Sequence, residues 1–193
     1  TIGSGLEPAP PAPARGVLDS LGLDRPYALY LGRVERNKGC ETLVRLFQQH
    51  LEGGGRPVPL VMAGPVLMPI PAHPLIRPLG FVSDEVREAL LAEARVLIVP
   101  SPYESLSLVL LEAWNHGVPA LVNGRCKVLK GQVRRAHGGL YYHHAGEFSE
   151  GLAWFLDQPA GARRLGAQGL AMVDREYRWP TVMERVERFL SAS

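Results

Sequence analysis

Cysteine is scarce in this sequence of 193 residues. Only Cys40 and Cys126 occur, and neither stands in a C-x-x-C or Cys/His spacing. The adjacent pair His143 and His144 likewise lies outside any H-E-x-x-H pattern. A secreted domain stapled by disulfides would carry more cysteines, so we expect a reducing compartment, the cytoplasm. The same scarcity predicts no structural metal site.

Long hydrophobic runs and a charge excess of one sign are missing as well. No apolar run approaches the roughly 18–20 residues that cross a bilayer, and the first residues lack the basic and apolar segments of a secretion signal. The 21 basic and 19 acidic residues leave a net charge of +2. A dedicated nucleic-acid-binding domain usually has a pI above about 9 and a one-sided basic patch. We therefore expect no nucleic-acid partner.

Three common signatures of nucleotide-binding proteins and hydrolases are absent. There is no G-x-x-x-x-G-K-[ST] phosphate loop and no G-x-S-x-G nucleophile elbow. Residues 3–8 begin like G-x-G-x-x-G, but Pro8 replaces the third glycine and no strand precedes them. These absences exclude a P-loop, the usual hydrolase elbow and an NAD-binding fingerprint.

The length corresponds to about one domain, at roughly 100–200 residues each. With 46% hydrophobic residues, such a domain can bury a core without staples. Four prolines crowd positions 8–13, and each fixes φ and removes a backbone donor. Residues 1–15 are therefore predicted to form an interdomain hinge or linker, and residues 16–193 the domain.

Short Val-, Leu- and Ile-rich runs alternate with helical patterns along this domain. Strands are predicted at residues 27–31, 59–63, 76–82, 96–99, 119–122 and 139–142. Helices are predicted at about 40–51, 83–94 and 106–115, followed by C-terminal helices at 146–191. Ser83 suits an N-cap, and Val182, Val186, Phe189 and Leu190 form a stripe that we expect to pack. The alternation predicts an α/β fold, a doubly wound parallel sheet of the Rossmann-like kind.

Ligands of such sheets bind beyond the carboxyl ends of the strands, where the first predicted strand is followed by Arg33 and Lys38. Lys38 also stands near the start of the next helix, and a helix N-terminus favours anions. Arginine adds a planar fork for phosphate oxygens and lysine a point charge. These residues predict a diphosphate clamp; the alternative is a pair of solvated loop cations.

Two acids stand eight positions apart around the start of the predicted helix 106–115. Glu104 precedes this helix and Glu112 lies within it. Residues 105–108 are expected in its first turn, where free N–H groups would hold a phosphate. Ionised carboxylates suit sugar hydroxyls because they accept hydrogen bonds. The alternative is a capping acid followed by an exposed helical glutamate.

A basic run without an acid follows the fifth predicted strand. It consists of Arg125, Lys127, Lys130, Arg134 and Arg135. Most runs of this kind are a solvated surface, and that is our interpretation here. An anionic partner or contact with a membrane face is the alternative.

In combination, these segments resemble the C-terminal, donor-binding domain of the retaining family-4 glycosyltransferases, the group 1 family. The resemblance covers nearly the whole chain in order. Its elements are hinge-like residues 2–6, a G-R…K-G element from Gly32 to Gly39, strand exits at 60–64 and 79–83, an E-x7-E element from Glu104 to Glu112 with a tail reaching Pro119, and closing residues 176–179.

The resemblance implies a GT-B architecture of which this chain is the second half, with an N-terminal acceptor-binding domain as the missing partner. It implies transfer of a sugar, with retention, from a nucleotide diphosphate sugar carrying UDP or GDP. The isolated chain would bind this donor but lack activity. Because two cations take the place of a divalent metal in this family, neither a metal nor another cofactor is expected.

The resemblance also assigns roles to individual residues. Arg33 and Lys38 would bind the donor diphosphate and Glu104 the sugar hydroxyls, as the catalytic set. The donor-binding set is Gly32, then Phe81 and Val82 near the base, the N–H groups of Leu106, Ser107 and Leu108 at the distal phosphate, and Glu112 on the ribose diol.

The chain departs from the family pattern in places. Gly3 and Ser4 replace the usual Pro-Asn of the hinge, and basic residues at 123–129 replace a small-residue loop that ends in an acid. Two other functions stay open beside glycosyl transfer. One is another reaction on the same fold, that of a phosphorylase, synthase or epimerase. The other is a non-catalytic nucleotide-sugar-binding module of a larger protein.

Overall fold

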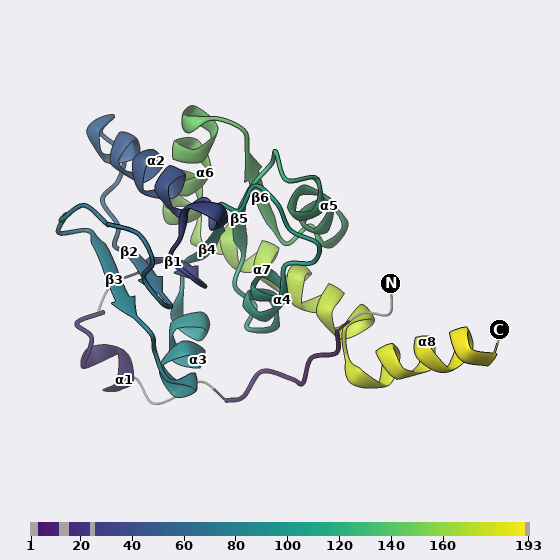
Figure 1. Cartoon of the computed structure of the whole chain (residues 1–193). Helices are drawn as coiled ribbons and strands as arrows, with labels where there is room; N and C mark the ends of the chain where they lie inside the picture. The colour runs from purple at the N-terminus through teal and green to yellow at the C-terminus, as the bar shows by residue number, and fades with distance from the viewer. Residues whose placement is uncertain (1–3, 12–15, 24–25, 192–193) are drawn as a thin grey trace.

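The computed structural model describes residues 4–11, 16–23 and 26–191. Within them, six parallel strands form one sheet in the order β3-β2-β1-β4-β5-β6 (Figure 1). The strands are β1 (Ala28–Leu31), β2 (Leu60–Ala63), β3 (Ile76–Gly80), β4 (Val96–Val99), β5 (Ala120–Asn123) and β6 (Gly139–Tyr142). This order, with β1 beside β4, confirms the doubly wound α/β prediction.

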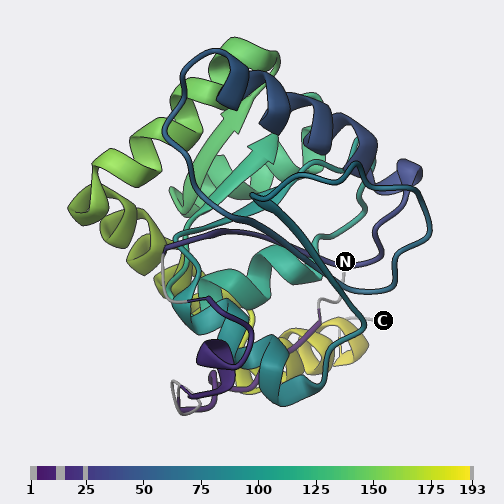
Figure 2. The ribbon, with the colours of Figure 1, turned by 90° about the vertical axis from the view of Figure 1, so that its left-hand side faces the viewer.

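The central strands are buried on both faces because helices cover both (Figure 2). Successive side chains of a strand point to opposite faces. Ala28 and Tyr30 pack with α2 (Cys40–Glu52) and α6 (Ala145–Asp157). Leu29 and Leu31 pack with the helices of the other face. Those helices are α1 (Gly16–Asp19), α3 (Asp84–Glu93), α4 (Leu108–Asn115), α5 (Lys127–Ala136) and part of α7 (Pro159–Glu176).

Most elements lie within one residue of where the hydrophobic pattern places them, and two predicted bounds shift by two residues. The third strand ends at Gly80 rather than at residue 82, because Gly80 turns the chain with φ of 69°. Helix α4 begins at Leu108 rather than near 106. Ser83 caps α3 as expected, accepting a hydrogen bond from the N–H of Val86 at 3.3 Å. Three elements were not predicted: α1, α5 and the 3₁₀ turn η1 (Arg36–Lys38).

The start of the described chain docks on its end. The N–H of Leu6 donates to the carbonyl of Tyr177 at 2.7 Å. A Cβ added to Gly5 would lie 2.3 Å from the ring of Trp179. Ile2 and Gly3 of the predicted hinge, and residues 12–15 of the predicted linker, lie outside the described residues. The described part of that segment is thus attached beside the junction of α7 and α8 (Trp179–Ser191).

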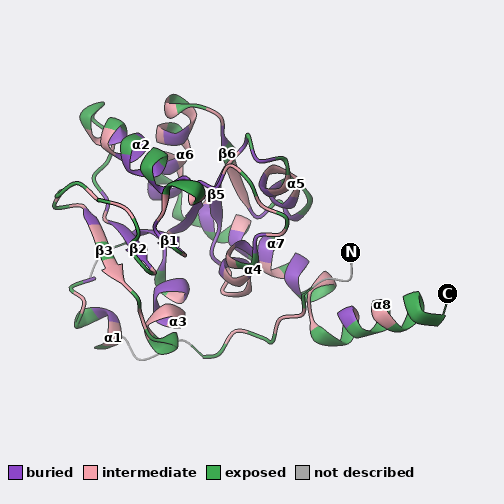
Figure 3. Cartoon of the chain, in the orientation of Figure 1, coloured by how far each residue is buried: buried purple, intermediate pink, exposed green. Residues whose placement is uncertain are grey.

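The prediction that the apolar stripe of α8 packs is wrong for its last part. Val182 is buried, but Phe189 is 61% and Leu190 68% exposed. The physical reason is that α8 makes few contacts with α7, and its last part projects away from the sheet (Figures 1 and 3).

Candidate functional site

A cavity opens where the direction of the sheet reverses, between the carboxyl ends of β1 and β4. This is the topological switch point at which open α/β sheets bind ligands. The cavity holds about 280 Å³. It is lined by the two strand ends, by the loop after β4 and by the first residues of α4: Tyr30, Leu31, Gly32, Lys38, Ile98, Val99, Ser101, Glu104, Leu106, Ser107, Leu108 and Val109.

Two glycines let neighbouring strand exits approach each other beside this cavity. Gly32 follows β1 with φ of 140°, and Gly64 follows β2 with φ of 133°. A Cβ on Gly64 would lie 2.1 Å from the carbonyl oxygen of Gly32. Glycine is therefore required at this contact, and the backbone that lines the cavity depends on it.

Lys38 and Glu104 meet at the wall of the cavity. The Nζ atom of Lys38 lies 3.0 Å from Oε1 of Glu104, and the Glu104 side chain is 14% exposed. Gly39 allows the turn that carries Lys38 to approach the chain near Glu104. Its φ is 76°, and a Cβ there would lie 2.4 Å from the carbonyl oxygen of Pro100. The turn that carries Lys38 thereby packs directly on the exit of β4.

Arg33 is not brought into the cavity with Lys38. Its guanidinium forms an ion pair with Glu35 at 3.2 Å and is 60% exposed. Its backbone is fixed, because its carbonyl accepts hydrogen bonds from the hydroxyl of Tyr30 at 2.7 Å and from the thiol of Cys40. Burial raises the pKa of both Tyr30 and Cys40, so these donors stay protonated at neutral pH. Arg33 is therefore paired with Glu35 and does not line the cavity.

The beginning of α4 offers backbone N–H groups to the cavity, but not the set expected. Because the helix begins at Leu108, residues 105–107 precede its first turn, which corrects the prediction for them. The N–H of Ser107 is already engaged, since it donates to Oε1 of Gln132 at 3.3 Å. Among the residues that line the cavity here, the N–H groups of Leu106, Leu108 and Val109 have no hydrogen-bond partner within the described residues.

Gln132 was missed by the sequence analysis. It is 1% exposed and comes from α5, a helix that was not predicted. Its Nε2 atom, like the Oγ of Ser107, has no hydrogen-bond partner among the described residues. The signal was present in the sequence, because Leu129, Gln132, Val133 and Ala136 form a helical stripe in which one member is polar.

Glu112 lies one turn further along α4 and does not line the cavity. Its Oε2 forms an ion pair with Arg87 of α3. Arg87 also contacts Glu88 at 2.8 Å, and Glu88 in turn contacts the ring of His116 at 2.7 Å. This network joins α3 to α4. Arg87 gave no sequence signal, because it stands among ordinary charged residues of an amphipathic helix.

Phe81 and Val82, predicted near the base of the ligand, follow β3. Phe81 is 84% exposed, and Val82 packs partly on the core. Neither lines the cavity between β1 and β4. They follow β3, and the strands β2 and β1 lie between β3 and this cavity.

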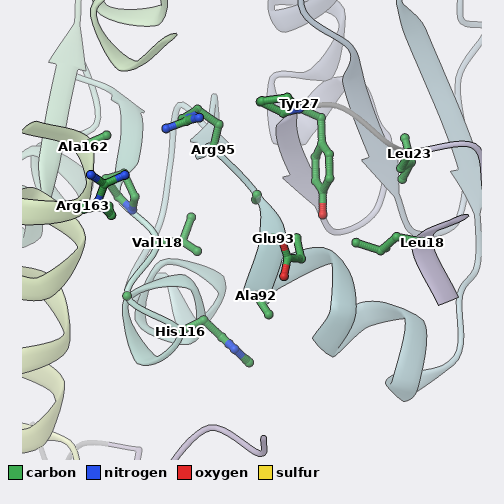
Figure 4. A pocket seen from close by; sticks show the side chains of 14 residues that line it. Leu18, Leu23, Tyr27, Ala92, Glu93, Arg95, His116, Val118, Ala162 and Arg163 are labelled. Carbon is green, nitrogen blue, oxygen red and sulfur yellow. The ribbon is translucent and has the colours of Figure 1, made fainter. Parts of the chain in front are cut away.

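A larger cavity of about 530 Å³ opens at the opposite edge of the sheet. Figure 4 shows Tyr27, Glu93, Arg95 and Arg163 around it. Tyr27 and Arg95 immediately precede β1 and β4, so this cavity lies at the amino ends of the strands. Ligands of doubly wound sheets bind at the carboxyl ends, and the smaller cavity is therefore the candidate site.

Residues 19–172 match the family described as glycosyl transferases group 1. The chain belongs to this family. The noted resemblance to the group 1 family is thereby confirmed.

Known relatives of this group 1 chain are glycosyltransferases. O-antigen chain mannosyltransferase B of Escherichia coli is 34% identical over 105 residues, which are 49% of this chain and 28% of that protein. The structure of sucrose-phosphate synthase from Thermosynechococcus elongatus is 26% identical, with a TM-score of 0.77 over 99% of this chain and 52% of that one. Anabaena Alr3699/HepE in complex with UDP-glucose is 14% identical and has the same fold, with a TM-score of 0.77 over 93% of this chain and 52% of that one. This chain thus spans about half the length of these solved structures.

Two further observations describe this group 1 chain. Within the described ranges, no group of three or more His, Cys, Asp and Glu side chains could hold a metal ion. No helix in the same part of the chain is both long and apolar enough to cross a membrane.

Proposed function

We propose that this chain is the donor-binding half of a retaining glycosyltransferase, which moves a sugar from a nucleotide diphosphate sugar to an acceptor held by a second domain. One observation carries the proposal. A cation, a carboxylate and the free N–H groups of a helix line the same cavity at the switch point of the sheet. This combination suits a ligand with a phosphate at one end and sugar hydroxyls at the other.

The departing diphosphate gains negative charge as the sugar leaves it. The N–H groups of Leu108 and Val109 would stabilise that charge, together with Lys38. Groups that are already oriented toward developing charge need no rearrangement during the reaction. Arg33 would add its guanidinium after exchanging Glu35 for the diphosphate. These cations would supply the charge that other transferases take from a divalent metal.

The two acids would bind different parts of the donor. Glu104 would accept hydrogen bonds from sugar hydroxyls, next to Lys38. Glu112 engages Arg87 through Oε2, so its Oε1 would accept from the ribose diol. The base would lie toward Phe81 and Val82, beyond the cavity itself.

The comparisons support this proposal in two ways. HepE has the same fold and its structure is a complex with UDP-glucose, while the relative from Escherichia coli is named an O-antigen chain mannosyltransferase. The half-length coverage supports a second domain that carries the acceptor.

The test measures transfer from labelled nucleotide sugars by the complete enzyme, with and without acceptor. Replacing one donor to a developing oxyanion lowers a rate by roughly 10²–10³, so Lys38→Ala should reduce transfer at least tenfold and Arg33→Ala/Lys38→Ala further. Exposed Arg36, which lines neither the donor cavity nor its wall, supplies the control Arg36→Ala. Undiminished transfer by the double variant contradicts the proposal, and product formed without acceptor favours the epimerase alternative.

Titration of the 193-residue chain separates binding from transfer. All the donor-contacting groups lie in this chain, so it should bind UDP or GDP with a dissociation constant on the order of micromolar to millimolar, or about −8 to −4 kcal/mol. It should transfer nothing, because closure against the second domain completes the site. Glu112→Ala should weaken nucleotide and nucleotide sugar alike, whereas Glu104→Ala should weaken only the nucleotide sugar. Equal damage to the free nucleotide would contradict these roles.

A further inference from the structure

A second cavity adjoins the candidate donor site. It holds about 630 Å³, and its lining includes Lys38, Tyr103, Glu104, Arg125 and Lys127. Lys38 and Glu104 line both cavities. If the diphosphate lies at the start of α4, the second cavity lies beyond Lys38 and Glu104, on the side toward which the donor presents its sugar.

The charges in this second cavity are not balanced. Lys38 is paired with Glu104. None of the ion pairs among the described residues includes Arg125 or Lys127. Arg125 donates from Nε to the carbonyl of His143 at 3.2 Å. That neutral partner orients the guanidinium and leaves its two terminal nitrogens for an anion.

The backbone of Arg125 is fixed relative to the donor site. The N–H of Arg125 donates to Oδ1 of Asn123 at 3.0 Å, and Nδ2 of Asn123 donates to the carbonyl of Pro100 at 3.1 Å. Asn123 therefore joins the exit of β5 to the exit of β4, which leads to Glu104. The bond from Ser107 to Gln132 joins α4 to α5 in the same way. Loose surface cations would need no such connections.

The start of helix α5 also carries basic residues without an acid. Its first turn has no acid and contains Lys127 and Lys130, although the positive end of a helix dipole favours acids at that position. Lys130 is oriented over the ring of Tyr141, 4.7 Å from its centroid. Unfavourable local charge of this kind is typical of functional sites.

We propose that this second cavity binds an oxyanion, a phosphate or carboxylate, carried by a sugar that takes part in the transfer. The proposal rests on the proposed function, which places the sugar end of the donor beside Glu104. The Arg125 guanidinium would hold the oxyanion with two parallel hydrogen bonds, as arginine does with carboxylates and phosphates, and Lys127 would add a charge. The oxyanion belongs either to the acceptor, as in a sugar phosphate, or to the transferred sugar, as in a uronic acid.

The first arm of the test addresses the acceptor. The chain saturated with UDP or GDP is titrated with glucose 6-phosphate and with glucose. We expect the phosphate to bind at least tenfold more tightly, with an advantage that falls as salt is raised. Arg125→Ala/Lys127→Ala should remove this advantage. Both side chains are exposed, so the variant should fold, and Arg125→Lys should retain part of the effect because it keeps the charge but not the fork.

The second arm addresses the transferred sugar. UDP-glucuronate and UDP-glucose are compared on the same variants, and a tenfold preference for the glucuronate that disappears in Arg125→Ala/Lys127→Ala would place the oxyanion on the donor. Arg134→Ala/Arg135→Ala is the matched control, because it removes the same charge from exposed positions of α5 outside the cavity.

Outcomes of the two proposals are distinguishable. If no nucleotide binds, the proposed function fails. If nucleotides bind but charged and neutral sugars bind alike in both arms, the anionic site is overturned while the proposed function stands. Equal loss in the Arg134→Ala/Arg135→Ala control would also overturn it, since a diffuse positive field would then explain the preference.

Discussion

Lys38 lies 3.0 Å from Glu104 although 66 positions separate them in the chain. The Glu104 side chain is 14% exposed and that of Lys38 35%, so the pair is only partly screened by solvent. A carboxylate this far removed from water needs a positive partner. Lys38 therefore balances the charge of Glu104, and a donor diphosphate would have to share the same ammonium.

Removing Lys38 alone should lower the free energy of unfolding by more than the contact itself contributes, whereas removing both charges of the pair should not. Lys38→Ala leaves Glu104 without its partner, whereas Lys38→Ala/Glu104→Gln removes the unpaired charge as well. We expect a coupling energy of about 0.5–1 kcal/mol, discounted for the exposure of Lys38, from urea unfolding of the two single variants and the double variant. Additive costs, that is, a coupling energy of zero, would show that the contact does not stabilise the fold.

The Arg87–Glu112 ion pair predicts a positioning role for Arg87. Arg87→Ala removes the group that orients Oε2 of Glu112, so the carboxylate should lose its preferred orientation toward a ribose diol. One hydrogen bond contributes about 0.5–1.5 kcal/mol, which corresponds to roughly a two- to thirteenfold change in affinity. The readout is the dissociation constant of the 2′,3′-dideoxy analogue of a nucleoside diphosphate divided by that of the nucleoside diphosphate itself.

This ratio should fall toward one in Arg87→Ala and recover in part in Arg87→Lys. A purely structural role would weaken both nucleotides equally and leave the ratio unchanged, which would refute the positioning role. The unfolding free energy of each variant, measured in parallel, shows how much of any loss comes from the fold.

Sequence patterns predicted the sheet and the strand exits because burial and chain direction are local properties. A run such as Val96–Val99 is apolar on both faces, and a parallel sheet buries both faces. The exits then place Gly32, Lys38 and Glu104 at one edge. The supporting roles of Asn123, Gln132 and Arg87 could not be predicted, because these residues act through contacts between elements that are distant in the sequence.

Helix α5 was overlooked for a related reason. Its basic residues suggested a solvated surface, and that interpretation is compatible with exposed Arg134 and Arg135. It concealed the buried stripe that contains Leu129 and Val133. In α8 the opposite error occurred. An apolar stripe predicts a face that can pack, but it does not identify a covering element, and Leu190 remains exposed.

Glu147 predicts a pH dependence of stability. Its carboxylate accepts a hydrogen bond from the N–H of His143 at 2.6 Å and contacts the ring of the same residue at 3.0 Å. The backbone bond, followed by the ring, holds the pKa of Glu147 below its ordinary value of 4.5. A lowered folded pKa stabilises the fold above the unfolded pKa, and this contribution is lost as pH falls through the folded value.

Glu147→Gln should therefore unfold at lower urea concentration than the unchanged chain at pH 7. The difference between the two midpoints should narrow once the pH falls below 4.5. Glu150→Gln is the control, since Glu150 is exposed on the same helix. A difference that stays constant from pH 7 to pH 3 would show that the ionised carboxylate is not responsible.

Gly64 offers the sharpest test of how the site depends on its backbone. Gly64→Ala puts a Cβ 2.1 Å from the carbonyl oxygen of Gly32, at a φ of 133°. Gly54→Ala is the matched control, because Gly54 also has a positive φ, 79°, but an added Cβ would meet nothing within 4 Å. Conformational strain alone should cost Gly54→Ala about 1 kcal/mol of unfolding free energy. Gly64→Ala adds a backbone overlap that only movement of the β1 exit can relieve, so its cost should exceed about 2 kcal/mol of unfolding free energy.

Since Gly32 lines the donor cavity, Gly64→Ala should also weaken nucleotide binding in titrations, whereas Gly54→Ala should leave it unchanged. Equal costs in both variants would mean that strain, rather than the approach of the two strand exits, sets the requirement for glycine at position 64.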